Sequence, residues 1–241
     1  MSSDLVVRLI GPPEADGEYV VLRHSGSDEE IVHLHDYERL YREPGLYERI
    51  VQELLGCRSP QVAAEGLADA VARLGLDPSD VVLLDLGAGT GLVGELTTGS
   101  GVGGVIGLDA LDAARAACLR DRPEVYRDYL VGDLAAPATG LLARLRAHDP
   151  TGLISAGALG GTHAPPVALL RALELLPAGA PVVLTIDARW MQAGAPFGVA
   201  VSRLLDSGQL RLLRRTRFQH RLTTTGAPIY YELLVAGNTP G

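Results

Sequence analysis

Residues 81–91 read VVLLDLGAGTG, and this stretch decides the fold. A run of valine and leucine ends at Asp85 and breaks into a loop with glycine at 87, 89 and 91. Two later runs end in the same way, since VIGLD closes at Asp109 and YLVGD closes at Asp133. The carboxylates are 24 residues apart, as one strand plus one crossover helix requires. The spacing therefore predicts three neighbouring parallel strands.

The carboxyl ends of parallel strands lie along one edge of a sheet, about 5 Å apart per strand. Open α/β sheets bind ligands in the crevice beyond that edge. We therefore expect the three carboxylates to line a single ligand about as long as a nucleoside with a tail. Glycine lacks a Cβ, so the loop is expected to bring its backbone close to that ligand.

The motif DLGAGTG, followed by GLD and VGD, resembles the S-adenosyl-L-methionine site of class I methyltransferases. The similarity runs from about Ser59 to the C-terminus. The resemblance implies an S-adenosylmethionine-dependent methyltransferase that releases S-adenosyl-L-homocysteine. It also implies that Asp85 and the glycine loop face the methionine half, Asp109 the ribose hydroxyls and Asp133 the adenine amino group. The implied cofactor-binding residues are Asp85, Gly87, Ala88, Gly89, Gly91, Asp109, Ala110, Asp133, Leu134 and Ser155.

Strand and helix signals alternate along the rest of the chain. Strands are predicted at 81–86, 104–109, 125–131, LISAGAL and PVVLTID, with helices at 59–75, 91–98, 111–120, 137–147, 165–176 and 196–207. Ser59 is the expected N-cap of the first helix, with proline next. Two final strands, 209–220 and 229–236, follow without a helix and predict an antiparallel pair. The fold class is thus α/β, a Rossmann-like doubly wound seven-stranded sheet of order 3-2-1-4-5-7-6 whose last strand is antiparallel.

We expect two parts, an N-terminal extension over 1–58 and the cofactor-binding domain over 59–241. DLVVRLIG and GEYVVLR, joined by PPEADG, predict a β-hairpin. Its role stays open between a dimer contact, a substrate cover and decoration. Asp36 to Leu55 reads as helical with a break at Pro44, and it resembles the lid of these methyltransferases. Its tyrosines could equally pack the helix on the domain.

Composition excludes several classes of protein. With 241 residues, 47% hydrophobic and 21% charged, the chain suits one well-buried domain with additions, and no run reaches membrane-spanning length. A net charge of -8 disfavours nucleic acid, although the patch of Arg211, Arg214, Arg215 and Arg217 keeps that partner open. Cys57 and Cys118 match neither a disulfide framework nor a metal site. The start, MSSDLVV, lacks a signal peptide, so we expect a cytoplasmic protein.

We expect the pocket for the methyl acceptor to lie after strands four and five, in the segments SAGALGGTHAP and DARWMQAG. His163 is the candidate base because its ordinary pKa of about 6.5 suits proton transfer near neutrality; a loop histidine without a chemical role is the alternative. The expected substrate pocket contains Tyr37, Tyr41, His163, Trp190 and Met191. The stretch is loosely similar to small-molecule methyltransferases such as methyltransferase-like protein 27 and its bacterial relatives. That similarity implies a small-molecule acceptor, in biosynthesis of specialised metabolites. No HxxE or paired-histidine set appears near strand five, so we expect no metal.

Three other functions remain open. A protein of this fold could bind the cofactor and catalyse a non-methylating step, or act as a non-catalytic partner that forms a homodimer through residues 1–34. An NAD-dependent oxidoreductase is the third, because GTGLVG at 89–94 also reads as GxGxxG with an acid about 20 residues downstream. Asp85 ahead of the glycines, Asp133 and the terminal strand pair all favour S-adenosylmethionine.

Overall fold

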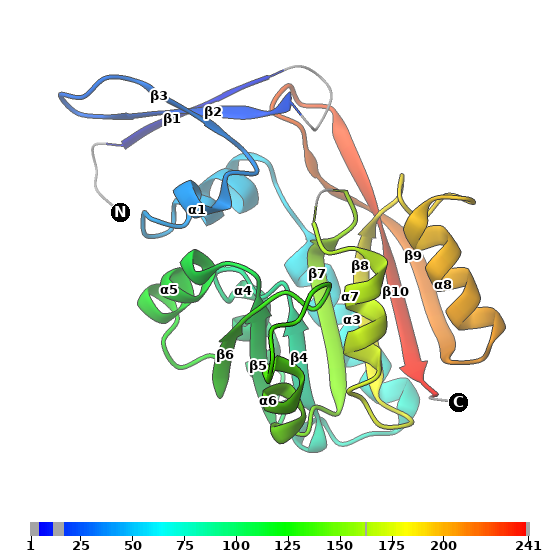
Figure 1. Cartoon of the computed structure of the whole chain (residues 1–241). Helices are drawn as coiled ribbons and strands as arrows, with labels where there is room; N and C mark the ends of the chain where they lie inside the picture. Colours follow the sequence, from blue (N-terminus) through cyan, green and yellow to red (C-terminus); the bar gives the residue numbers. More distant parts are fainter. Residues whose placement is uncertain (1–4, 12–16, 162, 240–241) are drawn as a thin grey trace.

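The computed structural model describes residues 5–11, 17–161 and 163–239 of the chain. Two β-sheets carry the architecture, a seven-stranded sheet flanked by helices and a three-stranded sheet near the N-terminus (Figure 1). The turn expected at PPEADG falls mainly on residues 12–16, which lie outside the described residues.

The large sheet has the predicted topology. Its strands are β4 (Val82–Leu86), β5 (Gly104–Asp109), β6 (Asp128–Val131), β7 (Gly152–Leu159), β8 (Pro181–Asp187), β9 (Leu210–Leu222) and β10 (Pro228–Asn238). They lie in the order β6-β5-β4-β7-β8-β10-β9, and β10 runs antiparallel to both neighbours. Counted along the chain this is 3-2-1-4-5-7-6, so the predicted strand order and the antiparallel last strand are confirmed.

Helices cover both faces of this sheet. They are α3 (Ser59–Leu74), α4 (Leu92–Thr98), α5 (Asp112–Asp121), α6 (Leu141–Ala147), α7 (Pro166–Leu173) and α8 (Pro196–Asp206), with a short 3-10 helix, η3, at Pro78–Asp80. Leu83 of β4 packs in the cluster that contains α3 and α4, whereas Leu84 packs in the cluster that contains α6, α7 and α8. Because successive side chains enter opposite cores, the strand reads as a continuous hydrophobic run.

Helix α3 departs from the prediction at its first residue. The N-cap is Arg58, and no side-chain hydrogen bond caps the helix. Ser59 is instead the first helical residue and is fully buried, with its hydroxyl 2.7 Å from the imidazole Nδ1 of His220. The serine thus ties the start of α3 to the end of β9 rather than capping its own helix.

The N-terminal extension is a small layered unit. It contains β1 (Leu5–Ile10), β2 (Tyr19–His24), β3 (Glu30–His33), α1 (Tyr37–Leu40), α2 (Leu46–Glu48) and a π-helix, η2 (Arg49–Leu54). The hairpin of β1 and β2 is present, and β3 adds a third antiparallel strand that sequence reasoning missed. Val32 is the residue of β3 that joins the hydrophobic cluster between this sheet and the helices.

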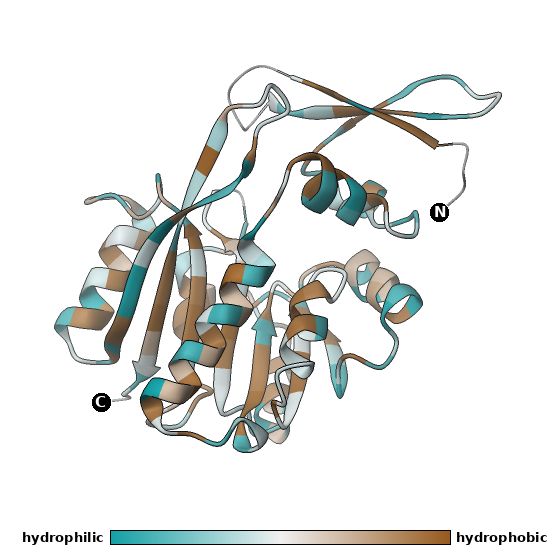
Figure 2. Cartoon of the chain, turned by 180° about the vertical axis from the view of Figure 1, so that it is seen from behind, coloured by the Kyte–Doolittle hydropathy of each residue, from teal (hydrophilic) through white to brown (hydrophobic). Residues whose placement is uncertain are grey.

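Hydrophobic residues follow the strands of the large sheet and also β1 of the extension (Figure 2). The extension has a hydrophobic cluster of its own, separate from the two clusters of the large sheet. Within the described ranges, no helix combines the length and hydrophobicity needed to cross a membrane.

Candidate functional site

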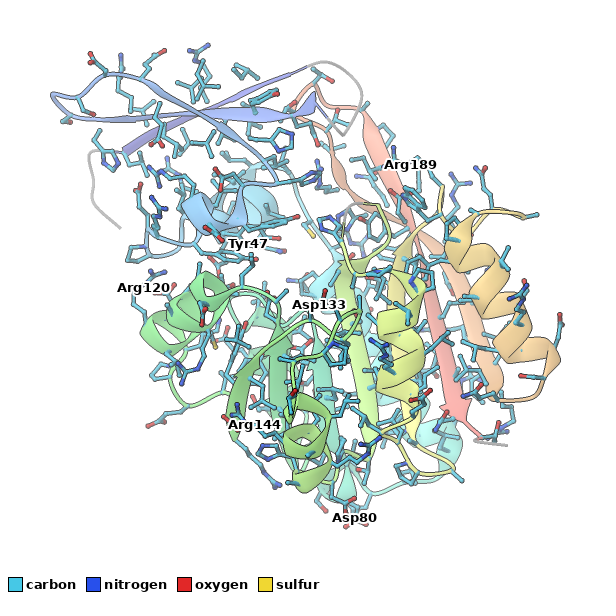
Figure 3. All side chains as sticks on the ribbon, in the orientation of Figure 1. Tyr47, Asp80, Arg120, Asp133, Arg144 and Arg189 are labelled. Atoms are coloured by element: carbon cyan, nitrogen blue, oxygen red, sulfur yellow. The ribbon has the colours of Figure 1, made fainter. Side chains whose placement is uncertain are left out.

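A cavity of about 620 Å³ lies between the carboxyl edge of the large sheet and the helices of the extension. Its walls include residues 86–90 after β4, 109–111 at the end of β5 and 132–134 after β6. In Figure 3, Tyr47 lies on the extension side of this region and Asp133 on the sheet side. The volume falls within the range of small-molecule sites.

The cavity gathers most of the residues singled out from the sequence. Those that line it are Gly87, Ala88, Gly89, Asp109, Ala110, Asp133, Leu134, Tyr37, Tyr41 and His163. Those that do not are Asp85, Gly91, Ser155, Trp190 and Met191. The first group comes from the ends of three parallel strands, from the lid and from the loop after β7, so distant segments of the chain meet here.

Asp109 is held in place by the glycine loop. Its Oδ2 accepts a hydrogen bond from the backbone N–H of Gly89 at 2.9 Å, and Oδ1 accepts one from the N–H of Leu111 at 3.0 Å. Burial raises the pKa of this carboxyl, and the backbone hydrogen bonds oppose the rise. A carboxylate has about four lone-pair positions, so Asp109 can still accept hydrogen bonds from a ligand in the cavity.

Asp133 occupies the corresponding position after β6. Its Oδ1 accepts a hydrogen bond from the N–H of Ala135 at 2.7 Å, which fixes the direction of the side chain. Unlike Asp109, it is exposed. The two acids thus line one cavity from adjacent strand ends, one half-buried and one open to solvent.

Asp85 lies behind the cavity. Its side chain is fully buried, Oδ2 accepts a 2.7 Å hydrogen bond from the hydroxyl of Tyr126, and Oδ1 has no partner among the described residues. Burial raises the pKa of this carboxyl to about 7, the bond from Tyr126 lowers it, and the charge of Asp109 raises it further. Ser155 is sealed off in a similar way, because its hydroxyl donates to the carbonyl of Leu86 at 2.8 Å.

Two glycines of the loop lie close to neighbouring elements of the protein. A Cβ at Gly87 would lie 2.2 Å from the Cβ of Ala158, and a Cβ at Gly91 would lie 2.8 Å from the sulfur of Cys118. These two glycines therefore make room for the protein's own β7 and α5. A Cβ at Gly89 would lie 3.2 Å from the hydroxyl of Tyr41, and both residues line the cavity.

Trp190 and Met191 belong to other surroundings. The Trp190 ring covers the loop after β7, where a Cβ on Gly160 would lie 3.3 Å from it. Met191 packs in the core and lines a separate hollow of about 450 Å³ together with Asp187 and Arg189. Asp187, at the end of β8, pairs with Arg189 at 2.7 Å, and neither residue lines the larger cavity.

Three tyrosines of the extension roof the cavity. Tyr37 and Tyr41 stack with ring centroids 5.8 Å apart, and Tyr47 meets Tyr41 edge-on at 5.1 Å. Burial raises the pKa of all three hydroxyls, so they stay protonated at neutral pH. The three tyrosines thus pack against one another and also line the cavity.

Polar contacts hold this roof onto the glycine loop. Glu48 of α2 accepts hydrogen bonds from the hydroxyl of Thr90 and from Arg122 Nη1, the latter at 2.9 Å. Arg120 of α5 donates to the backbone carbonyl of Tyr41 at 3.0 Å. The docked position of the extension is therefore linked to the loop that carries Gly89.

His163 faces the lid. Its Nε2 lies 3.5 Å from the hydroxyl of Tyr37, and its ring meets that of His35 edge-on at 5.3 Å. His35, which precedes α1, also lines the cavity, so the two histidines meet at its wall.

Sequence reasoning missed a second group of lining residues, at the ends of β9 and β10. His220, Arg221 and Tyr231 all line the cavity and are buried. No sequence pattern marks these residues, because their burial along FQHRL comes from contacts with distant segments of the chain. No three His, Cys, Asp or Glu side chains form a metal-binding group in the part of the chain that the structure describes.

Solved structures share this fold over most of the chain. Magnesium protoporphyrin IX methyltransferase from Synechocystis PCC 6803, solved with S-adenosylmethionine, is 16% identical, with 75% of this chain and 79% of that chain covered at a TM-score of 0.52. PH1948 from Pyrococcus horikoshii, assigned as an RNA methyltransferase, is 19% identical. The match covers 76% of this chain and 87% of that chain, at a TM-score of 0.51. Precorrin-6y C5,15-methyltransferase from Geobacter metallireducens is 14% identical. The match covers 75% of this chain and 87% of that chain, at a TM-score of 0.50. No protein-family model and no curated protein matches the sequence significantly.

These likenesses agree with the topology derived above. The chain has the fold of class I S-adenosylmethionine-dependent methyltransferases. The acceptors named for the similar structures include an RNA and tetrapyrroles, so the fold does not select one class of acceptor.

Proposed function

We propose that this protein is an S-adenosylmethionine-dependent methyltransferase that acts on an oxygen, nitrogen or carbon atom of a small metabolite. The observation that carries the proposal is the position of Asp109. Its carboxylate is fixed by the backbone of the glycine loop and lines the same cavity as Asp133. Residues 1–58 would act as the lid and residues 59–241 as the cofactor-binding domain.

The cavity carries polar groups that suit the hydrogen-bonding groups of the cofactor. Asp109 retains lone pairs for the two ribose hydroxyls, and Asp133 can accept from the adenine amino group. The backbone at 86–90 would hold the methionine half. Asp85 adds an orphaned, buried carboxylate oxygen behind that loop, which a nearby ammonium group would stabilise electrostatically. When bound, the cofactor supplies an electrophilic methyl group carried on a cationic sulfur.

The protein's own residues would position the acceptor and manage one proton. The roof of tyrosines excludes water and limits the acceptor's orientations, and such positioning can contribute roughly 7 to 11 kcal/mol. His163 lies at the acceptor side of the cavity and would accept the proton that an oxygen or nitrogen acceptor loses. Its closeness to Tyr37 fixes the imidazole against the lid.

The size and charge of the site support a small acceptor. The cavity is roofed by the extension, and the chain carries a net charge of -8, which repels phosphate backbones. The arginines of β9 are partly compensated, since Arg214 pairs with Asp69 and Arg215 with Glu232. Arg211, Arg214, Arg215 and Arg217 lie outside the cavity and give little support to a nucleic-acid acceptor.

The proposal is tested by binding and by the fate of the methyl group. S-adenosylhomocysteine should raise the melting temperature of the wild type, and NAD should leave it unchanged. Asp109→Asn should lose most of that shift. Asp80→Asn, at the opposite edge of the sheet from Asp133 (Figure 3), should keep it. Stabilisation by NAD alone would overturn the cofactor assignment.

The acceptor class is tested with methyl-labelled S-adenosylmethionine and a cell extract. Label should appear in the low-molecular-mass fraction. Label in RNA or protein would contradict a small acceptor. Binding without any transfer of label would favour a non-methylating step or a non-catalytic partner.

A further inference from the structure

The cavity extends past the cofactor residues toward a second set of strand ends. In the sheet order, Asp109 and Asp133 lie on one side of β4, whereas His220 and Tyr231 belong to β9 and β10 on the other side. A Cβ on Gly157 of β7 would lie 3.8 Å from His220 Cε1, which places the imidazole beside the β7 end. We call the region formed by His220, Tyr231, Gln52 and Gly157 the acceptor end.

Contacts along one edge and one face of the imidazole ring hold His220 in place. Its Nδ1 lies 2.7 Å from the hydroxyl of Ser59 and 3.7 Å from the sulfur of Cys57. Its ring stacks on that of Tyr231, with centroids 3.8 Å apart and planes 17° apart. Its carbonyl accepts a 2.8 Å hydrogen bond from the N–H of Arg58. Its Nε2 makes no hydrogen bond to any described residue.

The neighbours of Nδ1 favour one tautomer of His220. Ser59 and Cys57 each carry a proton that can be donated to Nδ1, and burial raises the pKa of the Cys57 thiol, so the thiol stays protonated. Burial lowers the pKa of His220 to about 3, which keeps the imidazole neutral. With Nδ1 accepting, the ring proton resides on Nε2. His220 thus presents a neutral N–H donor to the cavity and is too weakly basic to take a proton itself.

The acceptor end has no uncompensated charge among its described residues. Arg221 lines it, but both Nη atoms bind the carboxylate of Glu18, at 3.1 and 2.6 Å, and Glu18 is fully buried. Burial raises the pKa of the Tyr231 hydroxyl, which therefore stays protonated. The exposed acids Asp36 and Glu38 also line the cavity, from the lid. An anionic acceptor would lose its hydration here without gaining a counter-charge, which is costly.

Aromatic side chains are abundant in the walls of the cavity. Four tyrosines and three histidines are among the described lining residues. Aromatic rings favour stacked or edge-on partners. Gln52 adds a buried side-chain oxygen that has no partner among the described residues. The acceptor end is therefore suited to an uncharged, planar molecule with few polar groups.

We propose that His220 is a positioning residue whose Nε2–H holds the oxygen of an uncharged aromatic hydroxy compound, which is the methyl acceptor. The inference rests on the proposed function and deepens it. The hydroxyl proton passes to His163, the new bond joins the methyl carbon to the phenolic oxygen, and the carbon–sulfur bond breaks to leave an uncharged thioether. Donation from His220 stabilises the negative charge that develops on the oxygen as its proton leaves.

The test uses the full chain saturated with S-adenosylhomocysteine and two matched probes, 4-hydroxybenzamide and 4-hydroxybenzoate. Binding is followed by saturation-transfer NMR and calorimetry. The neutral amide should bind at least roughly tenfold more tightly than the anion. His220→Phe keeps a ring on Tyr231 but removes the donor, and should weaken amide binding by up to about tenfold. His220→Gln, which retains an N–H, should recover part of that loss.

Two further readouts keep the outcomes separate. Failure of the wild type to bind S-adenosylhomocysteine would sink the proposed function itself. Binding of S-adenosylhomocysteine with neither probe bound, with the benzoate preferred, or with His220→Phe unchanged would overturn only the role of His220. If His220→Phe does not fold, the ¹⁵N spectrum of the wild type decides, because a proton on Nδ1 rather than Nε2 of His220 contradicts the proposal.

Discussion

Replacing Asp85 by asparagine tests the electrostatics of the site most sharply, because Asp85 combines full burial with an orphaned oxygen. Burial raises the pKa of the Asp85 carboxyl from an ordinary 3.8 to about 7. At roughly 1.4 kcal/mol per unit, the ionised carboxylate costs the folded protein about 4 kcal/mol above pH 7. Asparagine is nearly isosteric, can still accept from Tyr126 and carries no charge.

The sign of the pH dependence follows from proton counting. Between about pH 4 and pH 7 the folded state holds a proton on Asp85 that the unfolded state has released, so the free energy of unfolding falls as the pH rises. Above about pH 7 both states are ionised and the penalty stays constant. We expect Asp85→Asn to be increasingly more stable than the wild type across this window, by up to about 4 kcal/mol.

The assay is urea unfolding of both proteins, without ligand, at a series of pH values from about 5 to 8.5. Titrating groups shared by both proteins cancel in the stability difference, and the pH-independent effect of the amide only adds a constant, so the change of that difference with pH reports Asp85. A stability difference that does not change with pH would refute the reasoning about Asp85. A difference that shrinks as the pH rises would refute it as well.

Three further outcomes follow from the contacts of the site. Asp109→Ala should weaken S-adenosylhomocysteine binding in calorimetry by roughly 1.5 to 3 kcal/mol, and unchanged affinity would move the ribose site elsewhere. Gly87→Ala should lower the melting temperature because its Cβ meets Ala158, and Ala158→Gly should restore part of the loss; no rescue would argue against this contact. Glu48→Gln should speed amide hydrogen exchange in residues 37–54 and leave β4 unchanged; equal protection in both proteins would show that this contact does not hold the lid.

The sequence was most informative where one physical rule acts locally. Hydrophobic runs that end in an acid predicted β4, β5 and β6, and the lack of a helix between the last two strands predicted their antiparallel pairing. Parallel strands put their carboxyl ends on one edge, so the meeting of Asp109 and Asp133 at one cavity followed directly.

Sequence reasoning was weaker where a side chain's surroundings come from distant segments. The burial of Asp85 depends on Tyr126, and the position of Gly87 depends on Ala158 of β7. The burial of His220 and Arg221 depends on the start of α3 and on Glu18 in the extension. None of these partners lies near in sequence, and no periodic pattern marks them.

The central claim is that Asp109 and Asp133 hold an adenosyl cofactor over the glycine loop, and a crystal structure of the protein with S-adenosylhomocysteine measures it directly. The account predicts ribose hydroxyls within hydrogen-bonding distance of the Asp109 carboxylate and the adenine beside Asp133. Electron density for the nucleoside in any other cavity, or with its ribose facing away from Asp109, would contradict it.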